Sequence, residues 1–397
     1  MLLNVERAMR TMDENGLDGL VATTLANVYY VSGLWSLSLT MFPLDSQVYA
    51  VVPRDELSKP IVVLPTGDLD TALACFPGVR LINFGTFYRE VAEGIELTPD
   101  ETRLKELSID RRPRADALDG LVAALEEAGL TGKTIGLDEK GIAPSYPAEL
   151  TKRFPRLKIQ PAASIFRHIK MVKTAEEIRR LRSAAQVTES AILEAVGVAK
   201  EGVSEAELGK VFQRALVDQG AELIFMALRI GRFTAFGQVP PGETRLNKGD
   251  RIWFDCGCRY MGYSSDVMRT FVLGDPGARA RRFYSGVLEA QERGLQAAKA
   301  GARAEDVFHA AMQGFREGGI PHAKRHHVGH GVGIDLYDPP LLAPGVDTVL
   351  EEGMVLNVET PYYEIGTGAL GVEDTFVVTQ GHPEFLTSIS RELVILE

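Results

Sequence analysis

The chain has 397 residues, of which 45% are hydrophobic and 24% are charged. This length is too great for one ordinary core, so two domains are expected, and the composition is that of a soluble globular protein. The net charge of -11 and the isoelectric point near 5.3 argue against a nucleic acid or an anionic membrane as partner, because no basic block offsets them.

The cysteines and the N-terminal segment indicate the compartment. Residues 1–7 lack the charged start and the apolar core of a secretory signal, and no apolar run is long enough to span a membrane. Three cysteines cannot build a disulfide framework. We interpret Cys256 and Cys258 as buried structural thiols, the alternative being a thiolate metal site. These features predict a cytoplasmic protein.

In the first half of the chain, the predicted elements alternate between helix and strand, which is typical of an α/β domain. Residues 157–169 contain Pro161 and few charges, and we interpret them as the connection to the second domain. The expected elements are a helix at 8–15, strands at 17–23, 47–53 and 60–65, a helix at 115–129 and a strand at 134–137.

The second half is predicted to pair long helices with antiparallel hairpins, which indicates an α+β domain. Thr174 with Glu177, and Ser204 with Glu207, form capping boxes that begin two amphipathic helices. Two further helices are expected, from about 281 to 298 and from 304 to 317.

Two aspartates flank the first predicted hairpin. Asp255 and Asp266 each lie in a strand-like run, and residues 257–262 between them have turn composition. A hairpin centred between Tyr260 and Met261 would place Asp255 directly opposite Asp266. Directly opposed residues share one sheet face, with Cβ atoms about 4.5–5.5 Å apart.

Two glutamates repeat this arrangement further along the chain. Glu359 and Glu373 flank a loop centred near Gly366, with apolar runs before the first and after the second. The two hairpins are therefore expected to present two carboxylate pairs to a common point.

A histidine cluster lies between the hairpins. Residues 326–333 hold three of the seven histidines beside three glycines, and glycine allows the close backbone approach that a bound ion needs. His330, on the glycine-flanked turn, is the predicted metal ligand. His326 is predicted to lie beside the metal shell or to contact the substrate.

These five residues predict a metal site. Four carboxylates at close range cannot all stay ionised alone, because like charges raise each other's pKa. Two divalent cations would balance them, and manganese, iron, cobalt and zinc all accept this ligand set. The alternative is that they are unrelated surface acids in a chain with 54 acidic residues. The matched pairs within apolar runs favour the metal site.

The order of these motifs resembles the pita-bread metallopeptidases: Xaa-Pro dipeptidase (prolidase), aminopeptidase P and their creatinase-like relatives. The shared pattern is Asp-x10-Asp, then Gly-His-Gly-x-Gly, Val-Glu and Glu-Asp-Thr. Residues 7–34 resemble the opening of the family's N-terminal domain, and residues 167–178 its inter-domain signature. The resemblance implies an α+β fold, with a creatinase-type α/β domain at 1–162 before a catalytic pita-bread domain at 163–397. Creatinase has this fold without the metal site, so the intact ligand set points to the metal-dependent branch.

Transferred residue by residue, the resemblance implies a role for each ligand. Asp255 would chelate one metal, and Asp266 and Glu373 would bridge both. His330 and Glu359 would complete the second metal's shell, with Glu359 also moving a proton. The resemblance further implies a homodimer in which the N-terminal domain of one subunit closes the active site of the other.

The predicted function is a metal-dependent hydrolase that cleaves a dipeptide or short peptide, with Xaa-Pro as the first candidate. A hydroxide bound by two divalent metal ions would attack the amide carbonyl. Manganese is the first choice of metal, with cobalt, zinc or iron as alternatives. Glu359, His326 and Tyr337 are the candidate catalytic residues.

Three positions depart from the peptidase pattern. Tyr337 stands where the peptidases carry a histidine seven residues after His330, residues 236–238 lack another histidine, and Gly371 replaces an arginine. Metal hydrolysis is therefore better supported than Xaa-Pro specificity. Two alternatives stay open: a pita-bread hydrolase or lyase acting on a small non-peptide substrate, and a non-catalytic metal-binding relative.

Overall fold

The computed structural model describes residues 2–75 and 79–397. These residues form two compact units, the first ending at Lys170 and the second running from Met171 to Glu397. The predicted domain boundary between residues 162 and 163 falls just before a helix, α8 (Ala163–Met171), and it stays a prediction. Among the described residues, no helix combines the length and the apolar character needed to cross a membrane.

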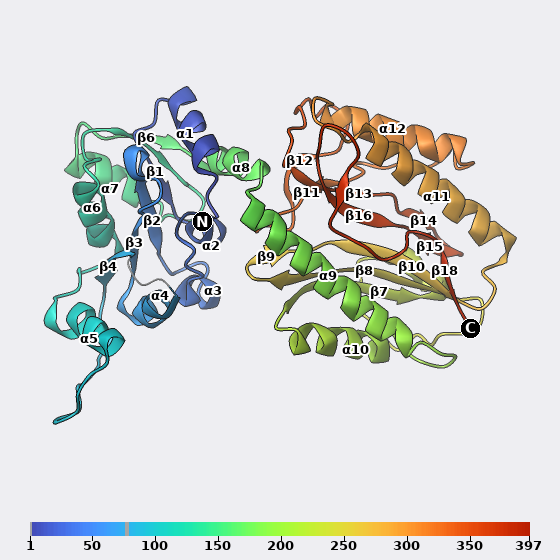
Figure 1. Ribbon diagram of the computed structural model, residues 1–397, viewed down its shortest axis with the longest axis horizontal. Coiled ribbons are helices and arrows are strands. Elements are labelled where there is room, and N and C mark those ends of the chain that lie inside the picture. Colours follow the sequence, from blue (N-terminus) through green and yellow to red (C-terminus); the bar gives the residue numbers. More distant parts are fainter. Residues whose placement is uncertain (1, 76–78) are drawn as a thin grey trace. The chain divides into compact units, whose positions relative to one another are not determined.

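The first unit is built around a mixed sheet with the strand order β4-β3-β2-β1-β5-β6 (Figure 1). Strand β1 pairs antiparallel with β2 and parallel with β5. The alternation predicted for this half is confirmed, because every expected strand is present. The strands are β1 (Gly19–Ala22), β2 (Tyr49–Pro53), β3 (Ile61–Pro65), β4 (Arg80–Phe84), β5 (Thr134–Leu137) and β6 (Lys158–Pro161).

Helices flank this sheet, and apolar side chains of α6 pack with those of β2 and β3 in one buried core. The helix expected at 8–15 begins earlier, because the side chain of Asn4 caps it by accepting a hydrogen bond from the backbone N–H of Arg7. The α-helices are α1 (Val5–Glu14), α2 (Leu25–Ser32), α3 (Leu37–Met41), α4 (Leu69–Cys75), α5 (Pro99–Lys105), α6 (Ala117–Glu127) and α7 (Tyr146–Arg153), followed by α8. Shorter helical turns are η1 (Arg54–Glu56), η2 (Thr66–Asp68) and η3 (Glu106–Asp110).

The interpretation of residues 157–169 as a mere connection is wrong. This segment holds β6, which pairs in parallel with β5, and most of α8. Phe166 and Ile169 are fully buried, and the Arg7 side chain donates to the carbonyl of His168 at 3.0 Å. The scarcity of charge in this stretch reflects burial in the first unit.

The first sheet of the second unit contains the Asp255 hairpin and has the strand order β18-β10-β8-β7, with β9 also paired to β8. The strands are β7 (Glu222–Ile230), β8 (Arg251–Tyr260), β9 (Tyr263–Ser264), β10 (Val267–Leu273) and β18 (Val394–Leu396). A 3-10 turn, η4 (Gly231–Ala235), follows β7.

The predicted register of this hairpin is wrong by two residues. The turn is centred between Met261 and Gly262, whose φ angles of 51° and 79° are those of a two-residue type I′ turn. Asp255 is therefore paired with Met268 and not with Asp266. Asp266 lies in the short break between β9 and β10, two positions along the ladder from Asp255. Residues two apart on a ladder share a face, so both carboxylates still point the same way.

A second sheet has the strand order β12-β11-β13-β16-β17. Its central pair is in the predicted register, because Glu359 stands directly opposite Glu373. The loop expected near Gly366 is itself a small hairpin of β14 and β15. The strands are β11 (His330–Gly331), β12 (Asp338–Leu341), β13 (Val355–Glu359), β14 (Tyr362–Glu364), β15 (Gly368–Leu370), β16 (Glu373–Val377) and β17 (Glu384–Phe385).

One pair of helices covers each of these sheets (Figure 1). The pair α9 and α10 packs on β8 and β10 through a core that includes Phe212 and Phe254, and the pair α11 and α12 packs on β13 through Val307 and Val358. Both predicted capping boxes are present. This confirms the α+β arrangement of the second unit. The helices are α9 (Ala175–Gly197), α10 (Glu205–Asp218), α11 (Gly277–Ala297) and α12 (Ala304–Glu317).

The thiols of Cys256 and Cys258 are buried in this unit and form no disulfide, as predicted for structural cysteines. Burial raises the pKa of both thiols, which keeps them protonated.

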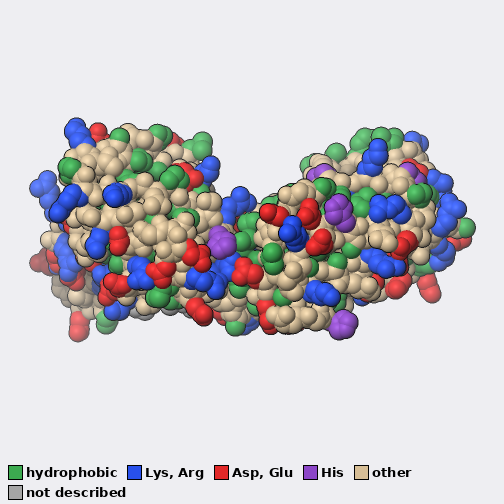
Figure 2. Space-filling model, turned by 90° about the horizontal axis from the view of Figure 1, so that it is seen from above, with side chains coloured by type: hydrophobic (Ala, Val, Ile, Leu, Met, Phe, Trp, Pro, Cys, Tyr) green, Lys and Arg blue, Asp and Glu red, His purple; other side chains and the backbone are tan. Residues whose placement is uncertain are grey.

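At the surface, Lys and Arg side chains are mixed with Asp and Glu side chains on the face shown in Figure 2.

Gly257 allows the break that positions Asp266. A Cβ atom at residue 257 would lie 2.1 Å from the carbonyl oxygen of Ser265, which passes directly over it. We expect Gly257→Ala to lower the free energy of unfolding by about 1–3 kcal/mol, the usual cost of overpacking. Gly197→Ala at the end of α9 is the matched control, because nothing lies within 4 Å of its new Cβ. Urea unfolding of both variants measures the difference, and equal stabilities would contradict this account.

Candidate metal centre

The predicted carboxylates share one cavity in the second unit. Its volume is about 490 Å³, and Asp255, Asp266, Glu359 and Glu373 all lie on its walls. The first sheet supplies the two aspartates and the second sheet the two glutamates. The expectation that two hairpins present their carboxylates to a common point agrees with this geometry.

Three of the five predicted ligands are close enough to hold one ion. Donor atoms of Asp266, His330 and Glu373 lie within 4.8 Å of one another, and all three residues are buried. The Nε2 atom of His330 is 3.5 Å from the Oδ2 atom of Asp266. The other two predicted ligands, Asp255 and Glu359, line the same cavity but lie outside this tight group.

Glu359 contacts Arg325 and His327. Its Oε2 atom accepts a hydrogen bond from Arg325 at 3.1 Å, and its Oε1 atom is 3.1 Å from Nδ1 of His327. Burial is the main cause that lowers the pKa of His327 to about 3, and the positive charge of Arg325 is the second cause. The His327 ring is therefore neutral, and its Nδ1 atom accepts a hydrogen bond from the backbone N–H of Gly329 at 3.3 Å, so its contact with Glu359 is not an ion pair.

All four carboxylates of the cavity have raised pKa values. Burial, followed by the charge of Asp266, raises the pKa of both Asp255 and Glu373 well above the usual range. Burial also raises the pKa of Asp266 and of Glu359, although His330 and Arg325 respectively offset part of that effect. Without cations, the cluster therefore holds protons.

His330 is oriented by the backbone and by Asn357. Its Nδ1 atom lies 2.9 Å from the carbonyl oxygen of Gly331 and donates to it, which leaves Nε2 facing Asp266. Burial lowers the pKa of His330, but the hydrogen bond and charge of Asp266 more than reverse this. The turn requires glycine at 329, because a Cβ atom there would lie 2.1 Å from the carbonyl oxygen of Asn357.

Three residues of the site received no role from the sequence. Asn357 accepts a hydrogen bond from the His330 N–H at 2.7 Å and donates to Glu373 at 2.5 Å. Asn357 lies two residues before Glu359 on β13 and therefore on the same face of the strand. A polar residue at that position of an apolar strand was the sequence signal that could have identified it. Arg325 and His327 flank His326, but sequence spacing does not reveal their contacts with Glu359, which lies 34 residues after Arg325 on another strand.

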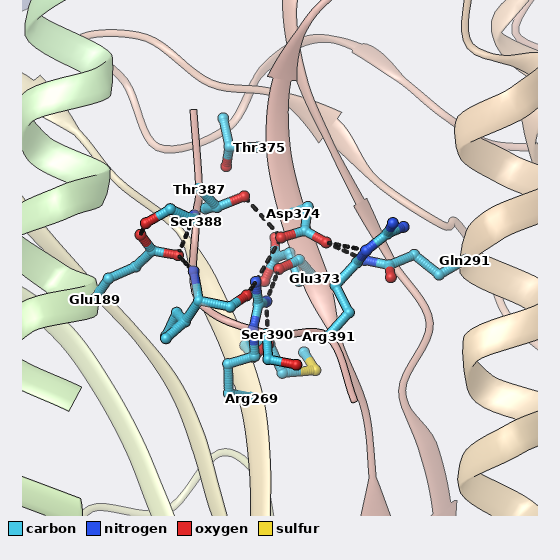
Figure 3. A network of polar contacts seen from close by, with 12 residues as sticks. Glu189, Arg269, Gln291, Glu373, Asp374, Thr375, Thr387, Ser388, Ser390 and Arg391 are labelled. Carbon is cyan, nitrogen blue, oxygen red and sulfur yellow. Dashed lines mark hydrogen bonds and ion pairs between the residues drawn. The ribbon is translucent and has the colours of Figure 1, made fainter. Parts of the chain in front are cut away.

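Behind the ligands, a buried network ties the two sheets together (Figure 3). The guanidinium of Arg269 on β10 pairs with Asp374 on β16 at 2.5 Å and also donates to the carbonyl of Glu373. Asp374 accepts further hydrogen bonds from Gln291 at 3.0 Å and from Thr387 at 2.7 Å. The strand that follows Asp266 is thus fixed to the strand that begins at Glu373.

The candidate residues outside the ligand set also line the cavity. His326 is on its wall, with its ring centroid 4.3 Å from that of His327. Tyr337 stacks on His330, with ring centroids 3.6 Å apart and an interplanar angle of 21°. Gly237 and Gln238 of the 236–238 segment are on the wall as well.

Gly371 has no room for a side chain. A Cβ atom at this position would lie 2.6 Å from Sδ of Met268 and 2.7 Å from the Trp253 ring. The side chains of Trp253 and Met268 therefore fill the space that the arginine of the peptidase pattern would need.

The donor set fits divalent cations. Oxygen ligands and one imidazole suit manganese, iron, cobalt or zinc, and buried carboxylates that repel one another are stabilised by positive charge. The His330 tautomer, with Nε2 turned toward Asp266, is the one that can bind an ion.

The fold and this donor set are those of a metallopeptidase, and known proteins give the same class. Residues 179–380 match the model of metallopeptidase family M24, and residues 4–172 match that of the creatinase/prolidase N-terminal domain. The chain belongs to metallopeptidase family M24, and its second unit is the pita-bread domain that was expected. Divalent metal binding follows from membership of this family.

Relatives cover nearly the whole chain. An Xaa-Pro dipeptidase of Pyrococcus furiosus is 26% identical over 392 residues, which span 98% of this chain and 99% of the relative. The solved structure of the prolidase from Pyrococcus furiosus matches with a TM-score of 0.73 and 25% identity, over 96% of this chain and 99% of that one. The X-Pro aminopeptidase from Thermotoga maritima matches in fold with a TM-score of 0.74 and 22% identity, over 99% of each chain.

The pair of Arg269 and Asp374 should dominate the stability of the second unit. Asp374→Asn keeps the shape but leaves a buried guanidinium without its carboxylate, so we expect the free energy of unfolding to fall by about 3–5 kcal/mol. Glu292→Gln is the control, because this carboxylate pairs with Arg391 while its side chain is 47% exposed. We expect the control to change stability by less than about 1 kcal/mol in the same urea titration. A similar loss in both variants would refute the structural role given to Asp374.

Proposed function

We propose that this protein is a metal-dependent dipeptidase that hydrolyses the bond before proline in Xaa-Pro substrates. The observation that carries the proposal is the meeting of four carboxylates on the walls of one cavity, with His330 close to two of them, Asp266 and Glu373. The full-length similarity to an Xaa-Pro dipeptidase supports the choice of substrate.

We assign two divalent cations to the cavity, with manganese as the first choice. Two cations supply four positive charges against the four carboxylates, so the loaded site is balanced. Asp255 would hold one cation, Asp266 and Glu373 would contact both, and His330 with Glu359 would complete the second. When bound, such a cation pair supplies a Lewis acid for the carbonyl oxygen and a water of lowered pKa.

The chain's own groups would handle the proton and the substrate. The raised pKa of Glu359 suits a carboxyl group that takes up a proton and returns it to the leaving amine. His326 and Tyr337 line the cavity wall, and we assign them hydrogen bonds to the peptide. Burial raises the pKa of Tyr337, so its hydroxyl stays a donor over the working range of pH.

A second candidate keeps the cations and changes the substrate to a small non-peptide amide or a lyase substrate. The observation that favours it is the altered cavity wall, where Tyr337 stands in place of a histidine. A homodimer in a reducing cytoplasm remains part of the proposal. Sedimentation analysis of the purified protein tests the dimer.

A substrate panel separates these functions. We expect the protein loaded with manganese or cobalt to cleave Xaa-Pro dipeptides, and metal analysis to give two ions per chain. The same protein treated with a chelator should be inactive and should recover when metal is added back. Two bound ions without turnover of any Xaa-Pro dipeptide or Xaa-Pro-Yaa peptide would exclude the peptidase and favour the non-peptide alternative. Substoichiometric metal after reconstitution would instead favour a non-catalytic protein.

Single substitutions test the ligand assignment. Asp266→Asn and Glu373→Gln should each abolish metal loading and activity, because each removes one of the charges that would contact both cations. The loss of metal affinity should exceed the roughly 10–100-fold seen when a residue beside the ligands is lost. His326→Ala is the comparison, because we place this histidine outside the ligand set. It should keep both metals and lower turnover. Loss of metal from His326→Ala together with its retention in His330→Ala would reverse our assignment within the cluster.

A further inference from the structure

Arg325 has a special place in the cavity. Among the described residues that line it, Arg325 is the only lysine or arginine. Its side chain is 9% exposed, so the guanidinium is largely withdrawn from water. It donates to the carbonyl oxygen of His327 at 3.2 Å and to the Oε2 atom of Glu359 at 3.1 Å.

These contacts leave part of the guanidinium available to a ligand. The group has five N–H donors in a planar fork that matches a carboxylate, and the two contacts use Nε and one Nη atom. Glu359 is also expected to contact a cation in the loaded enzyme, so its negative charge is shared. Arg325 then faces the cavity with less of its own charge neutralised.

The local charge of Arg325 points to an anionic ligand. Two divalent cations would offset Asp255, Asp266, Glu359 and Glu373, and the hydroxide would be held by these cations and not by Arg325. A neutral or cationic group brought beside Arg325 would leave that charge unpaired in a poorly hydrated place, which is unfavourable. A carboxylate would pair with it through charge-assisted hydrogen bonds.

The proposed proton transfer indicates which carboxylate this is. Glu359 returns a proton to the nitrogen of the leaving residue, and in a dipeptide the carboxylate carbon lies only two bonds from that nitrogen. A cation hydrogen-bonded to Glu359 therefore stands near the free carboxylate of the leaving residue. In a longer peptide, the same place would receive a neutral amide.

We propose that Arg325 binds the free C-terminal carboxylate of the substrate and so makes the enzyme a dipeptidase and not an aminopeptidase for longer chains. This inference rests on the proposed function and identifies its substrate class. Arg325 is a specificity residue in this proposal, because it acts on substrate charge and leaves the ion ligands in place.

The test compares a dipeptide with its neutral amide. Wild-type protein should hydrolyse Gly-Pro with a kcat/KM at least roughly 10-fold above that for Gly-prolinamide, the effect of a charge-assisted hydrogen bond. Arg325→Met should lower kcat/KM for Gly-Pro by roughly 10- to 100-fold more than it lowers kcat/KM for Gly-prolinamide, mainly through KM. Arg325→Lys should restore part of the preference, because it retains the charge without the fork.

A binding measurement does not depend on turnover. Calorimetry on the metal-loaded protein should show L-proline binding more tightly than L-prolinamide in the wild type, and this difference should vanish in Arg325→Met. Arg293→Met is the matched control, because this arginine pairs with Glu289 and Glu317 on the helices α11 and α12. The control should leave both substrates and both ligands unaffected.

The outcomes separate the two proposals. If wild-type protein cleaves neither Gly-Pro nor its amide, the proposed function fails and the inference falls with it. If wild-type protein cleaves both equally well, the function stands and the role of Arg325 is refuted. Equal losses on both substrates in Arg325→Met, or loss of metal from both Arg325→Met and Arg325→Lys by elemental analysis, would also refute it. Should Arg325→Met fail to fold, the wild-type ratio of acid to amide decides the question.

Discussion

The crowding of four carboxylates around one cavity is the constraint on which the catalytic unit depends. Two like charges about 4 Å apart repel by about 4 kcal/mol at the effective dielectric of a protein, and the whole stability of a domain is about 5–15 kcal/mol. The cavity therefore cannot hold all four charges without protons or cations. Burial raises the pKa of every carboxylate in the cluster, and the charge of neighbouring carboxylates raises it further for Asp255, Glu359 and Glu373. Folding and cation binding are then linked, because whatever neutralises the cluster also stabilises the fold that gathers it.

The rest of the unit resists this repulsion. Each sheet is held by its own pair of helices, so neither hairpin relies on the other for its core. Polar contacts connect them, because Arg269 pairs with Asp374 and Thr375 donates to the carbonyl of Asp266 at 3.2 Å. A small apolar cluster of Trp253, Met268 and Ala369 adds to this connection. Asp374 follows Glu373 on β16, so its side chain points to the opposite face of the sheet. One strand thus offers a ligand to the cavity and a structural anion to the network behind it (Figure 3).

The sequence predicted the elements of the fold and the ligand types, but not the local details that set the geometry. The Glu359 hairpin was placed correctly because its turn is symmetric about Gly366. The Asp255 hairpin was misplaced because turn composition does not distinguish a centre before Met261 from one after it, and the positive φ angles decide that point. The contacts of Arg325 join a loop to a distant strand. Such contacts arise from tertiary packing, and no spacing rule in a single sequence contains them.

The departures from the peptidase pattern change residues around the site and spare the proposed metal ligands. Of the changed residues, Tyr337 lines the cavity, whereas the proposed ligands and the contacts of Asn357 and Arg269 that support them are present. The packing of Trp253 against Gly371 also shows that the change is built into the core. Restoring an arginine at 371 would require the displacement of a fully buried tryptophan. Packing therefore excludes an arginine at 371, and Arg325 is the cationic side chain that the described cavity lining offers for the proposed contact with substrate.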